Sequence, residues 1–170
     1  MILYLARHGE AEPTGGSIAR DADRPLSARG EEDAMFMGRA LARISPSLTM
    51  VITSPLVRAV RTGEIMGKEI GSQPVFSVSN QLAPGFRFKS LYEELLALGG
   101  SGEALAVGHE PDLSGFIAYL ISGSASSPAT VALPPGAVAR LSVRGGKTRP
   151  DAALEWLLTP QVVRSLMKAG

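Results

Sequence analysis

The chain has 170 residues, of which 45% are hydrophobic and 19% charged, a balance that is ordinary for globular proteins and excludes a wholly disordered chain. This length suits one compact core, so we expect a single domain over residues 1–170. The net charge of +1 predicts no general nucleic-acid-binding surface, and the absence of cysteine excludes disulfides and thiolate metal sites.

The apolar stretches of the chain are too short for a membrane span. The first of them, residues 1–6, is interrupted by Arg7 and His8 before it could serve as the core of a signal peptide. We therefore expect a soluble, cytoplasmic protein without a membrane partner.

Strand-like and helix-like patterns alternate along most of the chain. Short, continuously apolar runs are typical of strands buried on both faces of a parallel sheet. The runs with this character are residues 1–6, 50–53, 74–78 and 104–107. Between these runs, apolar residues recur at helical spacing. A first helix is predicted after Ser27, a candidate N-cap, and a second, less regular helix over residues 56–70.

The clearest helix follows Asp112, a candidate N-cap. Its apolar residues fall at helical positions i, i+3, i+4, i+7 and i+8. They are Leu113, Phe116, Ile117, Leu120 and Ile121.

This order of elements predicts an α/β fold: a three-layer α/β/α sandwich around a mostly parallel sheet. Two later segments, residues 130–133 and 137–143, are joined by a Pro-Pro-Gly turn, and a third covers residues 152–158. We expect these three to pair antiparallel at one edge of the sheet. A last helix is predicted to start at Thr159-Pro160, since proline suits the first position of a helix.

Ligands of open α/β sheets bind beyond the carboxyl ends of the strands. The only two histidines of the chain follow predicted strands, His8 after the first and His109 after residues 104–107. Arg7 precedes His8, and Arg58 lies one turn into the helix after residues 50–53. A lone histidine or helix arginine is usually structural, but the joint placement of these four residues indicates one site.

Two guanidiniums and two imidazoles, at least one of them protonated, would form a cationic pocket suited to a phosphoryl group. A neutral imidazole in such a pocket can act as a covalent nucleophile at phosphorus, while the other cations hold the phosphoryl oxygens. This chemistry needs no metal, and the sequence offers no carboxylate cluster or histidine pair at metalloprotease spacing. We expect no cofactor.

Three stretches resemble the motifs of a known family. Residues 5–10, LARHGE, resemble the RHG signature of the histidine phosphatase superfamily, which has the phosphoglycerate mutase-like fold. Residues 54–62, SPLVRAVRT, resemble its second motif, SPxxRAxxT, and residues 108–110, GHE, resemble its third. The order of the three motifs matches the family, and the resemblance spans almost the entire chain.

Within the superfamily the chain is most similar to the small SixA-type phosphohistidine phosphatases. The supporting stretches are residues 23–27 with Gly30, 82–85, 107–113 and 156–160. The resemblance implies that His8 accepts the phosphoryl group, that Arg7, Arg58 and His109 bind it, and that Arg24 lines the entrance. It also implies the three-layer fold and a phosphorylated protein as the partner.

The chain departs from the family at its proton donor. Many members have a glutamate after the third strand, where this chain has Asn80-Gln81-Leu82, and an amide cannot supply a proton. A phosphate ester leaves as an alkoxide and needs that acid, whereas an imidazole, with a pKa of about 6.5, hardly does. Gln81 therefore favours phosphohistidine, and the alternative is that Glu10 or Glu110 is the proton donor.

The function expected from the sequence is a metal-independent phosphohistidine phosphatase that works in two steps through phospho-His8. One alternative is a phosphomonoesterase acting on a small metabolite. The other is a non-catalytic regulator that binds phosphate or phosphohistidine, although a mere binder needs no nucleophile. The sequence does not identify the substrate, the pathway or the oligomeric state.

Overall fold

The computed structural model describes residues 1–16, 18–44, 47–99, 102–124, 131–144, 146 and 150–168. The strands are β1 (Ile2–Arg7), β2 (Leu48–Thr53), β3 (Val75–Val78), β4 (Glu103–Gly108), β5 (Val138–Val143) and β6 (Ala152–Leu158). The helices are α1 (Ala28–Ile44), α2 (Val57–Ile70), α3 (Phe88–Gly99), α4 (Asp112–Ser122) and α5 (Pro160–Lys168). Two short 3-10 helices are η1 (Asp21–Asp23) and η2 (Asn80–Leu82).

The strands form one six-stranded sheet in the order β3-β2-β4-β1-β5-β6. β1, β2, β3 and β4 are parallel, while β5 pairs antiparallel with both β1 and β6. The register places Arg7 opposite Gly108, and Thr53 opposite Val107. The carboxyl ends of β1, β2 and β4 therefore meet at one edge of the sheet.

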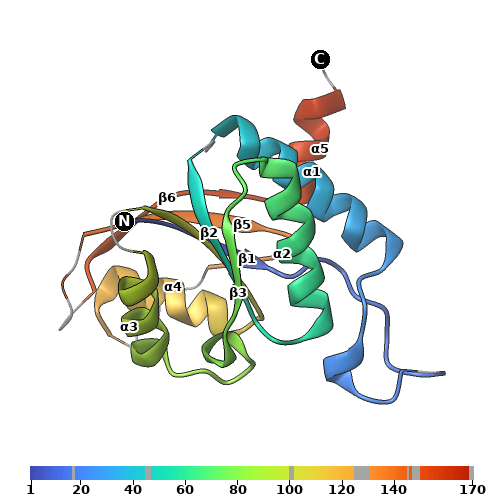
Figure 1. Cartoon of the computed structure of the whole chain (residues 1–170), viewed down its shortest axis with the longest axis horizontal. Helices are drawn as coiled ribbons and strands as arrows, with labels where there is room; N and C mark the ends of the chain where they lie inside the picture. The colour runs from blue at the N-terminus through green and yellow to red at the C-terminus, as the bar shows by residue number, and fades with distance from the viewer. Residues whose placement is uncertain are drawn as a thin grey trace.

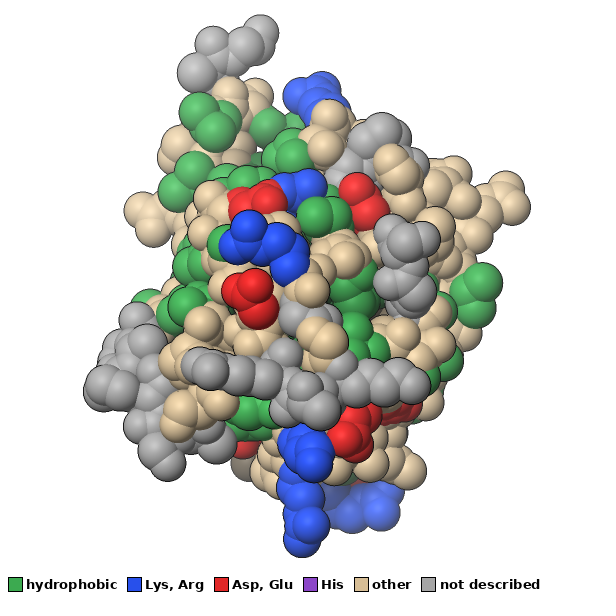
Figure 2. Space-filling view, turned by 90° about the vertical axis from the view of Figure 1, so that its left-hand side faces the viewer, with side chains coloured by type: hydrophobic (Ala, Val, Ile, Leu, Met, Phe, Trp, Pro, Cys, Tyr) green, Lys and Arg blue, Asp and Glu red, His purple; other side chains and the backbone are tan. Residues whose placement is uncertain are grey.

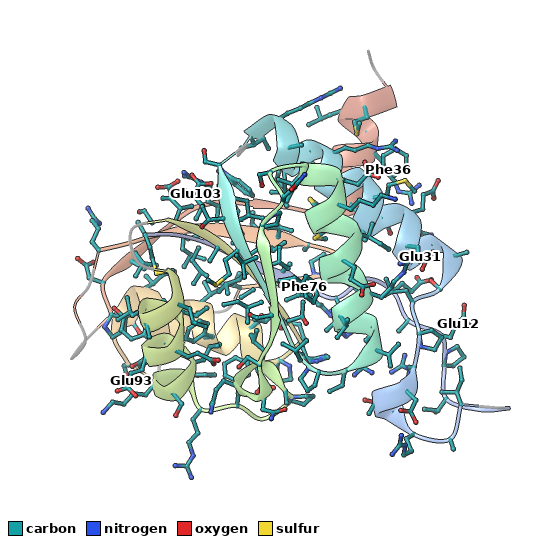
Figure 3. The ribbon with its side chains drawn as sticks, viewed as in Figure 1. Glu12, Glu31, Phe36, Phe76, Glu93 and Glu103 are labelled. Carbon is teal, nitrogen blue, oxygen red and sulfur yellow. The ribbon has the colours of Figure 1, made fainter. Side chains whose placement is uncertain are left out.

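β1 and β4 are buried on both faces because helices cover the sheet on both sides (Figure 1). The prediction of the same burial for residues 74–78 is wrong, because β3 is an edge strand and its side chains are largely exposed. In β1, Leu3 and Leu5 pack into the core beneath α3 and α4, while Tyr4 and Ala6 pack into the core beneath α1, α2 and α5. At the sheet edge, Phe76 of β3 lies against α2 (Figure 3). The predicted three-layer α/β/α fold is confirmed.

The predicted helix starts are confirmed after Ser27, at Asp112 and at Thr159-Pro160, but the N-cap role predicted for Asp112 is wrong. The Ser27 hydroxyl oxygen accepts from the amide of Gly30 at 3.1 Å, which caps α1. α5 begins at Pro160. At α4 the N-cap position belongs to Pro111, and the Asp112 carboxylate instead accepts from the Gly85 amide at 2.7 Å.

The segment before β5 is not a strand. Residues 131–133 have no ladder partner, and Thr130 lies outside the described residues. The Leu133 carbonyl instead accepts from Arg7 Nη1 at 3.0 Å. The chain then turns at Gly136, whose φ of 75° is in the left-handed region that favours glycine. Only the 137–143 and 152–158 segments were predicted correctly as an antiparallel pair.

Within the described part of the chain, none of the helices combines the length and the apolar character that crossing a bilayer requires. The face of the molecule in Figure 2 carries Lys and Arg side chains beside Asp and Glu side chains, with hydrophobic groups between them. Charges of both signs are thus interspersed on this face.

The loop that follows β1 packs backbone to backbone against the start of α1. A Cβ atom at Gly30 would lie 2.0 Å from the Glu10 carbonyl oxygen, and one at Gly9 would lie 2.8 Å from the Gly30 carbonyl oxygen. Both distances are shorter than any real contact, so α1 can approach this loop only because both residues lack a side chain.

This contact predicts opposite effects for two glycine-to-alanine changes in helices. Such a change usually stabilises a helix by up to about 1 kcal/mol. Gly67→Ala should follow that rule, because its Cβ would meet Val51 at an ordinary 3.4 Å. Gly30→Ala should instead lower the free energy of unfolding by about 2 kcal/mol or more, since backbone must move. Urea unfolding of both variants checks this, and equal midpoints would contradict the packing described.

Candidate active site

The predicted residues meet at the shared edge of β1, β2 and β4. His8 follows β1 and its amide donates to the Gly108 carbonyl at the end of β4, at 3.1 Å. His109 follows β4 directly, and the ring centroids of the two histidines are 5.0 Å apart. Arg58 reaches the same place from the first turn of α2, within 3.2 Å of the His8 ring.

His8 is held in one tautomer. Its Nδ1 lies 2.7 Å from the carbonyl oxygen of Gly9. A carbonyl can only accept, so Nδ1 carries the proton and Nε2 keeps its lone pair. The Nε–H of Arg58 donates to that lone pair at 3.2 Å. Nε2 is therefore the ring nitrogen whose lone pair is available for chemistry, and it lies beside the Arg58 guanidinium.

Arg58 is fixed by its own helix and by the loop that carries His8. The Thr62 hydroxyl, one turn later on α2, donates to the Arg58 carbonyl at 2.7 Å and accepts from the Gly9 amide at 3.1 Å. The buried threonine thus joins α2 to the loop after β1. This explains locally why a threonine stands four residues after the arginine.

Arg7 carries an unsatisfied donor. Its Nη1 donates to the Leu133 carbonyl, but its buried Nε has no hydrogen-bond partner among the described residues. Burial lowers the pKa of the Arg7 guanidinium, and the nearby Glu110 carboxylate raises it by a smaller amount. Leaving a buried N–H unpaired costs free energy, so an anion that accepts from it would be stabilised here.

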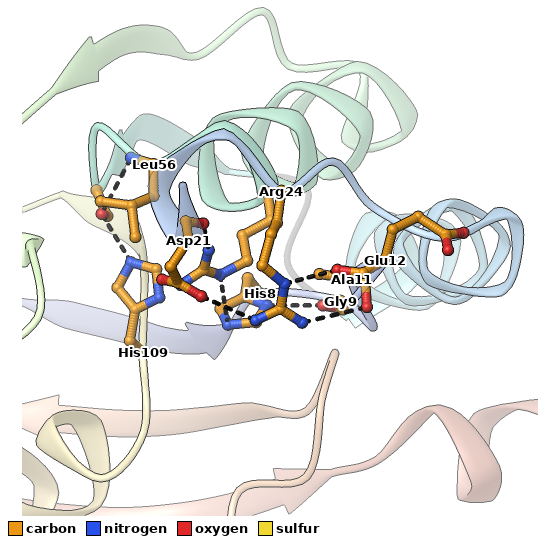
Figure 4. Close-up of polar contacts among 10 residues, drawn as sticks. His8, Gly9, Ala11, Glu12, Asp21, Arg24, Leu56 and His109 are labelled. Carbon is orange, nitrogen blue, oxygen red and sulfur yellow. Dashed lines mark hydrogen bonds and ion pairs between the residues drawn. The ribbon is translucent and has the colours of Figure 1, made fainter. Parts of the chain in front are cut away.

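His109 also has a free nitrogen. Its Nε2 lies 2.7 Å from the Ser54 hydroxyl, and its buried Nδ1 has no partner within the described structure. Figure 4 shows that this second ring nitrogen points toward Asp21 and His8. If the Ser54 hydroxyl donates to Nε2, the proton of the neutral ring is on Nδ1, where it can donate into the site.

Both imidazoles are neutral at pH 7. Burial, followed by the Arg58 and Arg7 charges, lowers the pKa of His8 to about 4, although the hydrogen bond to Gly9 opposes the shift. Burial, the His8 ring and Arg58 lower the pKa of His109 to about 3. The expectation of at least one protonated histidine is therefore wrong, because burial beside arginines disfavours the charged form. The positive charge of the pocket comes from its arginines.

Not all of the other residues predicted for the site are engaged there. Arg24 is three-quarters buried, and its charge lowers the pKa of His8, so it lies near the two rings. Glu10 is exposed and accepts from the Ser27 hydroxyl at 2.9 Å. Glu110 accepts from the Ser114 hydroxyl and backbone. Gln81 is exposed on η2.

Asp21 was missed by the sequence analysis. It lies on η1, and its carboxylate bonds both Arg58 and Arg24 at 2.9 Å (Figure 4). Those hydrogen bonds lower the pKa of Asp21. The available signal was its position three residues before Arg24, a spacing at which opposite charges pair. In the described residues, no group of three or more His, Asp and Glu side chains is arranged to hold a metal ion.

Comparisons with known proteins agree on one family. Residues 3–80 match the model of the histidine phosphatase superfamily, branch 1. An uncharacterised protein of Picosynechococcus is 34% identical over 116 residues, which are 66% of this chain and 68% of that protein. A Salmonella choleraesuis protein named "Probable phosphoglycerate mutase GpmB" is 37% identical over 75 residues, which are 44% of this chain but only 34% of that protein.

A solved structure of the protein histidine phosphatase SixA, complexed with tungstate, has a TM-score of 0.84. It is 23% identical and covers 96% of this chain and 99% of its own. The chain belongs to the histidine phosphatase superfamily. Its fold is the phosphoglycerate mutase-like fold that SixA also has. The protein is a phosphatase-type enzyme of this superfamily.

The neutral state of both histidines in this histidine phosphatase superfamily member can be observed by NMR. Because the chain has only two histidines, an untagged protein gives two ring Hε1 signals. With pKa values of about 4 and about 3, both signals should keep neutral-imidazole shifts from about pH 8 to about pH 5.5. In urea both should titrate near 6.5. A midpoint near 6.5 in the folded protein would contradict the burial argument.

Proposed function

We propose that this protein is a phosphatase that removes phosphoryl groups from protein phosphohistidine through a phospho-His8 intermediate. One observation carries the proposal. The Gly9 carbonyl holds the proton on His8 Nδ1, so Nε2 presents its lone pair beside the Arg58 guanidinium. A neutral imidazole fixed in this way is a nucleophile for a group that needs cationic donors around it.

In the first step the Nε2 lone pair of His8 attacks phosphorus, and the bond from phosphorus to the substrate's imidazole nitrogen breaks. The substrate ring, protonated on its other nitrogen, takes the electron pair of that bond and leaves as neutral imidazole. The Arg58 Nε–H, which now donates to Nε2, turns to a phosphoryl oxygen. The unpaired Nε–H of Arg7 and the Nδ1 of His109 are further donors for those oxygens. Donors already fixed around the transferring group stabilise the charge in the transition state.

In the second step water attacks phospho-His8, and the P–N bond to Nε2 breaks. The hydrogen bond from Nδ1 to the Gly9 carbonyl persists throughout, so the ring keeps its orientation. Phosphate leaves with both protons of the water, and His8 returns to its starting tautomer. Arg7, Arg58 and His109 serve both steps. No step requires a metal or an organic cofactor.

The choice of phosphohistidine rests on the leaving group. An ester needs an acid to protonate its departing alkoxide, whereas an imidazole leaves with a conjugate-acid pKa of about 6.5. The two carboxylates considered as donors, Glu10 and Glu110, are engaged with Ser27 and Ser114. The similarity in fold to SixA, a protein histidine phosphatase, supports the same substrate class.

A second candidate is a phosphomonoesterase that acts on a small metabolite. The observation in its favour is the match of 75 residues to the phosphoglycerate mutase relative, at 37% identity. That match covers only about a third of the relative's length. It therefore supports shared motifs more strongly than a shared substrate.

The test is phosphate release from a phosphohistidine-bearing protein and from an aryl phosphate ester, measured with the same enzyme preparations. Wild type should favour phosphohistidine, and His8→Ala should abolish release because the nucleophile is gone. Arg58→Ala should lower kcat/KM by about a hundredfold or more, as for loss of a fixed donor to the transition state.

The matched control is Arg61→Ala, on the same helix. Arg61 is exposed and pairs with Glu31 and Glu64, outside the site, so its removal should change kcat/KM by less than about twofold. A preference for the ester would favour the phosphomonoesterase instead. Full activity of Arg58→Ala would contradict the proposed site.

A further inference from the structure

Asp21 occupies the donors that a phosphoryl group would use. The backbone carbonyl of Asp21 accepts from Arg58 Nη1 at 2.6 Å, and its carboxylate accepts from Arg58 Nη2 at 2.9 Å. The other carboxylate oxygen accepts from Arg24 Nη1 at 2.9 Å. With Arg58 Nε donating to His8, each nitrogen of the Arg58 guanidinium has a partner inside the protein.

The ion pair joins a surface residue to a buried one. The Arg58 side chain is 6% exposed, while the Asp21 side chain is 59% exposed. The carboxylate therefore reaches into the pocket from outside, and water can take over its hydrogen bonds when it leaves. Its negative charge also raises the pKa of the His109 ring, in opposition to burial and the nearby arginines, which lower that pKa. The carboxylate thus lies among Arg58, Arg24 and His109.

The segment that carries Asp21 is held at its base, while η1 is exposed. At the base, the Glu12 amide donates to the Pro25 carbonyl, and Arg24 donates to the carbonyls of Glu12 and Ala11. None of the residues of η1 is buried. Figure 1 shows this segment extending away from the sheet at the lower right. η1 is therefore held by polar contacts and not by buried apolar ones, so displacing Asp21 breaks no apolar packing.

We propose that Asp21 is an internal anion that holds Arg58 in place and competes with the phosphoryl group for it. The inference rests on the proposed role of Arg58 in binding that group. A dianionic phosphoryl group and a carboxylate repel each other, and the dianion makes the stronger charged hydrogen bonds. The incoming phosphoryl group displaces Asp21. After hydrolysis the returning carboxylate helps to expel phosphate, so Asp21 limits inhibition by product.

The test is the binding of inorganic phosphate, as a competitive inhibitor and by calorimetry, to wild type and Asp21→Asn. The amide keeps the size of the side chain and one accepting oxygen but removes the competing charge. Phosphate should bind about five- to tenfold more tightly to this variant. Asp23→Asn is the matched control, because Asp23 lies on the same turn and pairs with Arg20 rather than Arg58. It should bind phosphate like wild type.

Each other outcome would overturn the inference. Weaker phosphate binding to Asp21→Asn would mean that the carboxylate only positions Arg58. Equal changes in Asp21→Asn and Asp23→Asn would mean that general charge, and not competition for Arg58, is responsible. Arg58→Ala separates the premise from the inference: it should lose phosphate binding, and unchanged binding would refute the proposed role of Arg58. Calorimetry measures phosphate binding without turnover, so a wrong substrate assignment does not affect that arm of the test.

Discussion

The hydrogen bond from His8 Nδ1 to the Gly9 carbonyl is the interaction on which the candidate site depends. It is short, at 2.7 Å, and it links the ring to the backbone of the next residue in the chain. Without it the proton of a neutral imidazole could occupy either nitrogen, and Nε2 would not be reserved for attack. The Gly9 amide is in turn held by Thr62 of α2, so the nucleophile and Arg58 share one support.

The parallel sheet supplies the rest of the geometry. Adjacent parallel strands in register bring their carboxyl ends together, so residues about 100 positions apart, such as His8 and His109, become neighbours. Burial at this edge lowers the pKa of both imidazoles and keeps them neutral. Burial therefore leaves an uncharged imidazole next to charged arginines, which is the arrangement that the proposed attack on an anionic phosphoryl group needs.

The sequence was sufficient for the fold and for the convergence of Arg7, His8, Arg58 and His109, because both follow from periodicity and strand ends. It was insufficient wherever a tertiary contact outweighed a local pattern. The sequence around Asp112 predicts a helix cap, yet its carboxylate accepts a hydrogen bond from the amide of Gly85. The apolar residues 131–133 predict a strand, yet the Leu133 carbonyl accepts a hydrogen bond from the Arg7 side chain. The protonation of the histidines depends on burial, which no local pattern measures.

The most direct test of the account is the position of the phosphoryl group on His8. The phosphoenzyme, trapped from a slow substrate, can be examined by 31P NMR together with 15N-labelled histidine, which distinguishes the two ring nitrogens. The account predicts phosphorus on Nε2, with Nδ1 still protonated and bonded to the Gly9 carbonyl. Phosphorus on Nδ1, or on a residue other than His8, would contradict it.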